Sequence, residues 1–164
     1  MRVGILTISD RSAMGEREDE SGPVLAELAQ SNDWIVVEST VLPDEGDQIS
    51  NLLGEWSDSG KVNLILTTGG TGFSKRDVTP EATLEVVDRL APGLSEAMRA
   101  HSLKKTPHAM LSRAVAGIRG STLIVNLPGS PKGARDNLEF LLPVLQHATQ
   151  VLSDDPSAEN GHKA

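Results

Sequence analysis

Short runs of apolar, often β-branched residues alternate along the chain with longer segments whose apolar side chains recur at helical spacing. The short runs predict buried strands, because they are too brief for a helix and are bounded by polar or turn residues. We expect strands over residues 3–9, 34–42, 62–68, 114–118 and 122–127, and helices that begin near residues 21, 46, 79, 94 and 134. This alternation predicts an α/β fold, a three-layer α/β/α sandwich with helices on both faces of a mostly parallel sheet.

Two local features modify this pattern. The runs at 114–118 and 122–127 are separated by a short turn sequence that contains glycine, so we expect a hairpin and hence one antiparallel strand pair. The last helical segment, 134–152, contains Pro143, which predicts a kink or an interruption.

Length, charge and cysteine content limit the class of protein. A chain of 164 residues suits one domain, which we place at residues 1–152, and the polar residues 153–164 predict a disordered C-terminal tail. The formal net charge of -8 opposes nonspecific binding to nucleic acid or to an anionic membrane. The absence of cysteine excludes disulfides and thiolate metal sites. The apolar run at the N-terminus is too short for a signal peptide or a membrane span, so we expect a cytoplasmic protein.

The segment 64–82, LILTTGGTGFSKRDVTPEA, combines a strand, a glycine loop and the start of a helix. Three glycines within positions 69–72 allow the backbone to adopt positive φ, so that its N–H groups can converge on an anion such as phosphate. Thr79 is expected to cap the helix and Pro80 to occupy its first position. The segment matches neither the dinucleotide-binding fingerprint nor the P-loop, and a tight turn without a ligand is the alternative interpretation.

Charged residues follow the glycines directly. Asp77 stands beside Lys75 and Arg76. A carboxylate next to an anion-binding loop can hold a divalent metal that also binds phosphate oxygens, while Lys and Arg neutralise the same oxygens.

A second strand–loop–helix junction occurs at residues 128–133, PGSPKG. Ser130 is expected to cap the following helix, and Lys132 in its first turn makes this junction another candidate anion site. Asp44 follows the strand 34–42, where it is either a helix N-cap or a ligand, and Asp10 follows the first strand at the start of a polar segment expected to be a loop. Because ligands bind beyond the carboxyl ends of parallel strands, these positions are expected to converge on one site.

Five strings resemble the molybdopterin adenylyltransferase family, the MogA/MoaB group: TISDRSAMGEREDESG, LPDE, LTTGGTGFSKRDVTPEAT, LSRAVAGIRGSTLIVNLPGSPKGA and LLPVLQHA. The resemblance covers about residues 3–150. It implies an enzyme of molybdenum cofactor biosynthesis, usually a homotrimer, that uses Mg²⁺ and ATP to transfer AMP to the phosphate of molybdopterin with release of pyrophosphate. The two aspartates that the family requires fall on Asp44 and Asp77, which we expect to be catalytic and to hold Mg²⁺.

The remaining candidates bind the substrates ATP and molybdopterin. They are Ser9, Asp10, Arg11, Gly69, Gly70, Thr71, Gly72, Lys75, Arg76, Thr79, Arg113, Pro128, Gly129, Ser130 and Lys132. Among these, we expect Lys75, Arg76, Arg113 and Lys132 to neutralise phosphate charge.

The sequence shows no fused molybdate-insertion domain and no long C-terminal extension, so a separate molybdate-insertion enzyme is the expected partner. Two alternatives stay open. One is a trimeric binding module that holds pterin or nucleotide without turnover, or a scaffold of a biosynthetic complex. The other is a metal-dependent nucleotide hydrolase, by analogy with competence-damage-type proteins that share the architecture.

Overall fold

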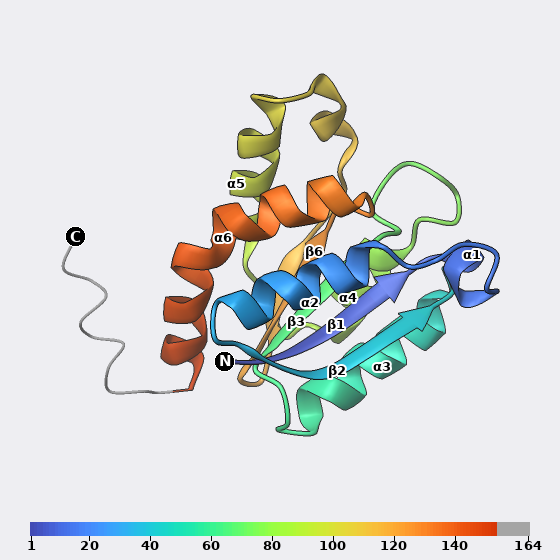
Figure 1. Ribbon diagram of the computed structural model, residues 1–164. Helices are drawn as coiled ribbons and strands as arrows, with labels where there is room; N and C mark the ends of the chain where they lie inside the picture. Colours follow the sequence, from blue (N-terminus) through green and yellow to red (C-terminus); the bar gives the residue numbers. More distant parts are fainter. Residues whose placement is uncertain (154–164) are drawn as a thin grey trace.

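The computed structural model of the protein describes residues 1–153, so all but the first residue of the predicted tail lies outside the described part (Figure 1). The strands are β1 (Arg2–Ile8), β2 (Ile35–Leu42), β3 (Leu64–Thr68), β4 (Arg89–Leu90), β5 (Ala116–Arg119) and β6 (Thr122–Leu127). The helices are α1 (Asp10–Ala13), α2 (Ser21–Ser31), α3 (Gly46–Asp58), α4 (Thr79–Val86), α5 (Pro92–Leu103), the 3₁₀ helix η1 (Pro107–Leu111) and α6 (Pro131–Leu152).

The strands form one mixed sheet in the order β2-β1-β3-β6-β5-β4. Strands β2, β1, β3 and β6 are parallel, and β5 runs antiparallel to β6, which confirms the predicted hairpin. The short strand β4 adds a second antiparallel pairing, to β5, that the sequence pattern does not predict. Helix α4, which begins at Thr79 close to the expected start, ends at Val86, and the N–H of Asp88 donates to the Ile118 carbonyl at 2.7 Å instead of continuing the helix.

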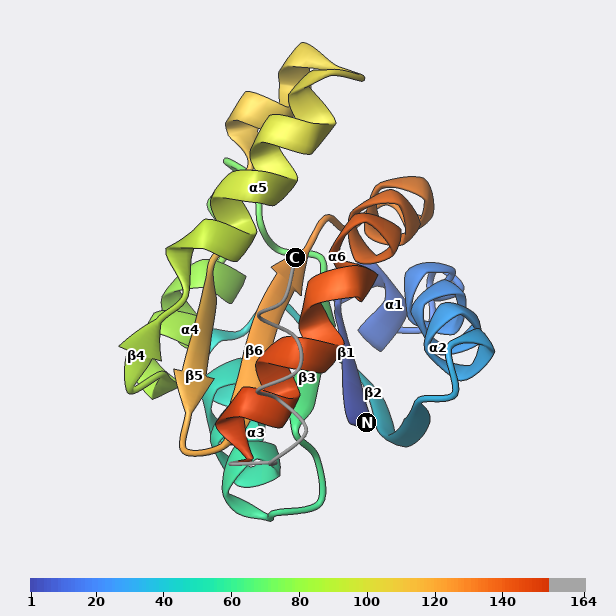
Figure 2. The ribbon, with the colours of Figure 1, turned by 90° about the vertical axis from the view of Figure 1, so that its left-hand side faces the viewer.

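Both faces of the central strands β1, β3 and β6 are buried beneath helices, which confirms the three-layer sandwich. In β1, Val3 and Ile5 pack beneath α2, α5 and α6, whereas Leu6 and Ile8 pack against α3 and α4. Such alternation of two apolar faces is typical of a parallel sheet covered by helices on both sides. Figure 2 shows α2 and α6 on one side of the sheet and α3 and α4 on the other.

Helix α1 was not expected from the sequence, and helix α6 shows what the proline within it does. The segment after β1 begins with the single-turn helix α1 rather than a loop, because the Ser9 hydroxyl accepts from the Ser12 N–H at 3.2 Å and caps that turn. Helix α6 stays continuous through Pro143 and changes direction along its length, so the predicted kink is confirmed without an interruption (Figure 1).

Helix α5 and η1 extend beyond the sheet as an arm above the start of α6 (Figures 1 and 2). Within residues 1–153, no helix has the length and apolar character that a membrane span requires.

Candidate functional site

The candidate site lies at the edge of the sheet where the four parallel strands end. Asp10 follows β1, Asp44 follows β2, Gly69 follows β3 and Pro128 follows β6. These four strands are neighbours in the sheet, so their carboxyl ends bring loops from distant parts of the chain side by side.

Two pockets open at this edge. The first, of about 480 Å³, lies between the glycine loop (residues 69–77), the α5–η1 arm and the start of α6, and is called the α5 pocket. The second, of about 410 Å³, lies between the ends of β1 and β2, the segment before α2 and the glycine loop, and is called the β1 pocket. Gly70, Asp77 and Gly129 line both. A group bound in one pocket would therefore adjoin a group bound in the other at Asp77.

The residues expected from the sequence divide between these pockets. Those that line the β1 pocket alone are Ser9, Asp10, Arg11, Asp44, Gly69 and Arg76. Those that line the α5 pocket alone are Thr71, Gly72, Pro128 and Ser130. Those that line neither pocket are Lys75, Thr79, Arg113 and Lys132.

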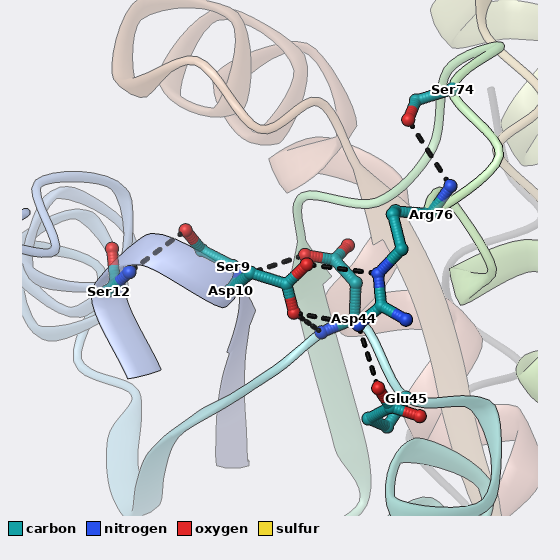
Figure 3. Close-up of polar contacts among 7 residues, drawn as sticks. All are labelled: Ser9, Asp10, Ser12, Asp44, Glu45, Ser74 and Arg76. Atoms are coloured by element: carbon teal, nitrogen blue, oxygen red, sulfur yellow. Dashed lines mark hydrogen bonds and ion pairs between the residues drawn. The ribbon is translucent and has the colours of Figure 1, made fainter. Parts of the chain in front are cut away.

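Arg76 lines the β1 pocket and points from the glycine loop toward Asp10 and Glu45 (Figure 3). Its guanidinium donates to both carboxylate oxygens of Asp10, at 3.0 and 2.9 Å, and to Glu45 Oε1 at 2.8 Å. The hydrogen bond from Arg76 is the main reason that the pKa of Asp10 is lowered. Asp10 therefore carries its charge at neutral pH, already paired with a cation.

Asp44 differs from Asp10 in its surroundings. Its Oδ2 accepts from the backbone N–H of Asp10 at 2.9 Å, whereas a Cβ added at Gly70 would lie 3.0 Å from its Oδ1. Burial raises the pKa of Asp44, and the negative charges of Asp10 and Asp77 raise it further. The hydrogen bond from the Asp10 N–H and the positive charge of Arg76 lower it, but by less. The N-cap of α3 is Glu45, so the alternative interpretation of Asp44 as that cap is wrong.

The glycine loop adopts the backbone conformations that its glycines predict. Gly69 has φ of 101° and Gly70 has φ of 61°, both in the region that favours glycine. A Cβ at Gly69 would lie 2.1 Å from the Ile8 carbonyl oxygen, so the loop passes directly over the end of β1. Asp77 closes the loop by accepting from the Ser74 N–H at 2.9 Å.

A buried polar network supports the glycine loop from below. The Thr79 hydroxyl donates to the Gly69 carbonyl at 2.9 Å, and the Thr83 hydroxyl donates to the Thr79 carbonyl at 2.8 Å. Asn126 in β6 donates to the hydroxyls of Thr83 and Thr67 at 2.9 and 3.0 Å. The four side chains have no exposed surface, and Thr79 is not the N-cap of α4, which is Val78. Thr79 thus lies beneath the loop rather than on a pocket wall.

The second junction caps α6 as expected. Ser130 has an extended backbone, and its hydroxyl accepts from the Gly133 N–H at 3.2 Å, with Pro131 in the first turn. The positive end of the α6 dipole therefore lies at the α5 pocket, where Ser130 and Gly129 form part of the wall.

The α5 and β1 pockets also contain residues that sequence reasoning missed. Arg99, His108 and Asn137 line the α5 pocket, and Arg17 and Asp19 line the β1 pocket. The arm that carries the first two contains the segment 104–108, whose basic composition is its only local signal. Thr67 and Asn126 of the buried network have a sequence signal, since they are polar residues within apolar strand runs, whereas Thr79 and Thr83 stand near charged residues in α4.

The donor set of the site suits a hard cation. Among residues 1–153 there is no group of three or more His, Cys, Asp or Glu side chains placed to hold a metal. Asp44 and Asp77 nevertheless interact electrostatically, and the absent side chain of Gly70 leaves space beside Asp44 Oδ1. Mg²⁺ is often held by one or two carboxylates, with substrate phosphates and water as its other ligands, so two aspartates fit this ion.

The comparisons with known proteins identify relatives along nearly the whole chain. The family model of a probable molybdopterin binding domain matches residues 4–147. Gephyrin from Dictyostelium discoideum is 42% identical over 95% of this chain, which spans only 23% of that protein. The molybdopterin adenylyltransferase of Escherichia coli (strain K12) is 45% identical over 85% of this chain and 72% of its own length.

The solved structures agree with this result. The molybdopterin biosynthesis enzyme MoaB from Thermus thermophilus is 52% identical and superposes with a TM-score of 0.89. The superposition covers 94% of this chain and 98% of that one.

Proposed function

The chain belongs to the family of probable molybdopterin binding domains, and we therefore propose that it is a molybdopterin adenylyltransferase of molybdenum cofactor biosynthesis. In the reaction, an oxygen of the molybdopterin phosphate attacks the α-phosphorus of ATP. The bond between the α-phosphorus and the bridging oxygen to the β-phosphate breaks, and pyrophosphate leaves with the electron pair. AMP is thereby joined to the pterin through a new phosphoanhydride.

One observation carries this proposal: two pockets share a wall formed by Gly70, Asp77 and Gly129. A transfer between two bound substrates needs one site for each, with the reacting phosphates brought together where the sites meet. Since the nucleophile is already an anionic phosphate, positioning and charge neutralisation are sufficient, and no strong base is required.

We assign the charge neutralisation to named groups. Asp44 and Asp77 would hold Mg²⁺, which when bound neutralises phosphate charge and orients the oxygens. The N–H groups of the glycine loop and of the α6 N-terminus face anionic substrate groups. Arg11 and Arg76 at the β1 pocket provide positive charge, whereas Lys75 and Lys132 act at longer range because they line neither pocket.

The test is a pyrophosphate-release assay with purified protein, Mg²⁺, ATP and freshly prepared molybdopterin, run beside a reaction without pterin. The proposal expects pyrophosphate and an adenylylated pterin only when the pterin is present. Pyrophosphate or AMP release without pterin would instead indicate a nucleotide hydrolase. Pterin binding without any release would indicate a binding module.

The variant Asp77→Asn tests the assigned site in the same assay. It removes the charge at the shared wall and is expected to abolish turnover while the oligomer stays intact. Asp47→Asn is the matched control, because Asp47 is exposed in the first turn of α3 and lines neither pocket. Unchanged turnover in Asp77→Asn would contradict the role assigned to Asp77.

Three further statements belong to the proposal. We propose a homotrimer, supported by exposed apolar side chains such as Phe140 and Val144 on α6, which a subunit contact would cover. Light scattering should then give three times the chain mass of 17.4 kDa.

We also propose that the reaction takes place in the cytoplasm, where ATP is available. A separate molybdate-insertion enzyme would then accept the adenylylated product.

A further inference from the structure

Arg113, in the connection between η1 and β5, makes four contacts with the segment that carries Asp77. Its backbone N–H donates to the Thr71 carbonyl at 2.9 Å, and its Nε donates to the Gly72 carbonyl at 2.6 Å. Its Nη2 donates to the Asp77 carbonyl at 2.5 Å, and its Nη1 forms an ion pair with Glu81. One guanidinium therefore connects both ends of residues 72–77 with the first turn of α4.

These contacts attach the loop to the rest of the molecule. The bonds of Ser74 with Asp77, at 2.9 and 3.0 Å, lie within the loop and shape it without fixing its position. The ion pair of Arg76 reaches outside the loop, but the side chain of Arg76 is 52% exposed, so solvent screens that pair. The side chain of Arg113 is less exposed, at 34%, and two of its acceptors are backbone carbonyls.

Glu81 provides a firm anchor for this guanidinium. Burial would raise the pKa of Glu81, but the hydrogen bond and charge of Arg113, with help from the backbone, outweigh it and lower the pKa. Glu81 is thus a carboxylate at neutral pH, and it belongs to α4, which packs in the core through Ala82.

We propose that Arg113, anchored by Glu81, is a positioning residue that holds Asp77 at the shared wall of the two pockets. This inference rests on the proposed function, because it takes Asp77 as the catalytic carboxylate. It replaces the expectation that Arg113 neutralises substrate anions, since the guanidinium faces protein oxygens and lines neither pocket. Lysine cannot replace arginine here, because a single ammonium cannot reach three acceptors arranged as a fork.

The two roles of Arg113 predict different kinetics. A positioning residue acts on the reacting geometry, so Arg113→Gln should lower kcat by about 100-fold, the size of effect that a displacement of about 1 Å can produce. The KM for ATP should stay within about 3-fold, because positioning leaves ground-state binding in place. Arg113→Lys should behave like Arg113→Gln, and Glu81→Gln should show a smaller decrease in kcat. A raised KM with unchanged kcat would overturn the proposal in favour of direct anion binding.

Arg119 is a matched control for these variants. It also pairs with a carboxylate, Asp58, at 2.9 and 2.7 Å, and donates to a backbone carbonyl, that of Val86, at 3.0 Å. It lines neither pocket. Arg119→Gln should therefore lower the melting temperature without changing kcat, and a comparable decrease in kcat for Arg119→Gln would overturn a specific role for Arg113.

The contacts of Arg113 with the carbonyls of Gly72 and Asp77 and with Glu81 are called the clamp. Hydrogen exchange of the loop amides tests this clamp without any activity measurement. In Arg113→Gln and Arg113→Lys, peptides that cover residues 72–78 should exchange faster than in the wild type, and in Arg119→Gln they should not. Unchanged exchange in both Arg113 variants would overturn the clamp, whatever the activity. Faster exchange combined with a wild type that transfers no AMP would support the clamp and contradict the proposed function, so the two failures are distinguishable.

Discussion

Asp10 and Asp44 exchange hydrogen bonds between their backbones and side chains. The N–H of Asp10 donates to Asp44 Oδ2 at 2.9 Å, and the N–H of Asp44 donates to Asp10 Oδ1 at 3.0 Å (Figure 3). The two residues follow neighbouring parallel strands, so this reciprocal pair joins the ends of β1 and β2. The two carboxylates have different partners. Asp10 accepts from the Arg76 guanidinium, whereas Asp44 Oδ1 lies beside Gly70.

Asp44→Asn should reduce turnover without destabilising the fold. Because burial raises the pKa of Asp44, the ionised carboxylate reduces stability above that pKa, and this penalty disappears as pH falls through it. An amide oxygen can still accept from the Asp10 N–H. We expect an equal or higher melting temperature at about pH 7 in buffer without divalent cations, together with a decrease in kcat of about 100-fold or more. A marked drop in melting temperature would show that Asp44 is a structural residue.

Gly70→Ala should damage the site more than a change at a comparable glycine. A Cβ at Gly70, with φ of 61°, would lie 2.3 Å from the Thr79 hydroxyl, so steric overlap adds to backbone strain. Gly120 has φ of 54° but open space around it, so Gly120→Ala carries the strain alone, about 1–2 kcal/mol. Denaturant unfolding should show the larger loss for Gly70→Ala, and only that variant should lose turnover.

Thr79→Val tests the buried network beneath the glycine loop. Removing the hydroxyl leaves the Gly69 carbonyl without its partner at 2.9 Å, which should lower the free energy of unfolding by about 1–3 kcal/mol. The displaced loop should also reduce kcat, whereas Thr79→Ser, which keeps the hydroxyl, should retain most of it.

The control for the threonine change is Thr149→Val. Thr149 is also buried, and its hydroxyl donates to the Leu145 and Gln146 carbonyls in α6, away from both pockets. This variant should lose some stability and no turnover. Equal losses of kcat in Thr79→Val and Thr149→Val would contradict a specific support of the loop.

Asp58→Asn should destabilise the protein at neutral pH and not in acid. The hydrogen bond from Arg119 holds the pKa of Asp58 below its usual value. A carboxylate with a lowered pKa stabilises the fold above its unfolded pKa of about 3.9, and this contribution is lost as pH falls through the lowered value. The melting temperatures of the wild type and of Asp58→Asn should therefore differ at about pH 7 and converge at about pH 2. A difference that persists in acid would mean that the charge of Asp58 is not responsible.

Parts of the site were visible in the sequence because they depend on local chemistry. The glycines of the loop and the Ser130 cap were predicted from residue types whose backbone preferences act over a few positions, and the structure has both. Thr79 and Asp44 illustrate the limit. Local context favours a helix-cap role for both, yet the Thr79 hydroxyl donates to the Gly69 carbonyl beneath the loop, and Asp44 accepts from the N–H of Asp10, 34 positions away.

Five of the six described strands, most of the helices, the hairpin and the loops that carry the site follow from the amino-acid sequence alone, because apolar periodicity and turn chemistry act between near neighbours. The short strand β4 does not, because it forms only by pairing with β5. Folding of the whole chain was needed to place Asp77 on the wall shared by two pockets, and to bring Arg113 against residues 36 and 41 positions away. Strand order in the sheet sets which loops meet. Contacts between such distant residues depend on packing and burial that no local pattern of residues encodes.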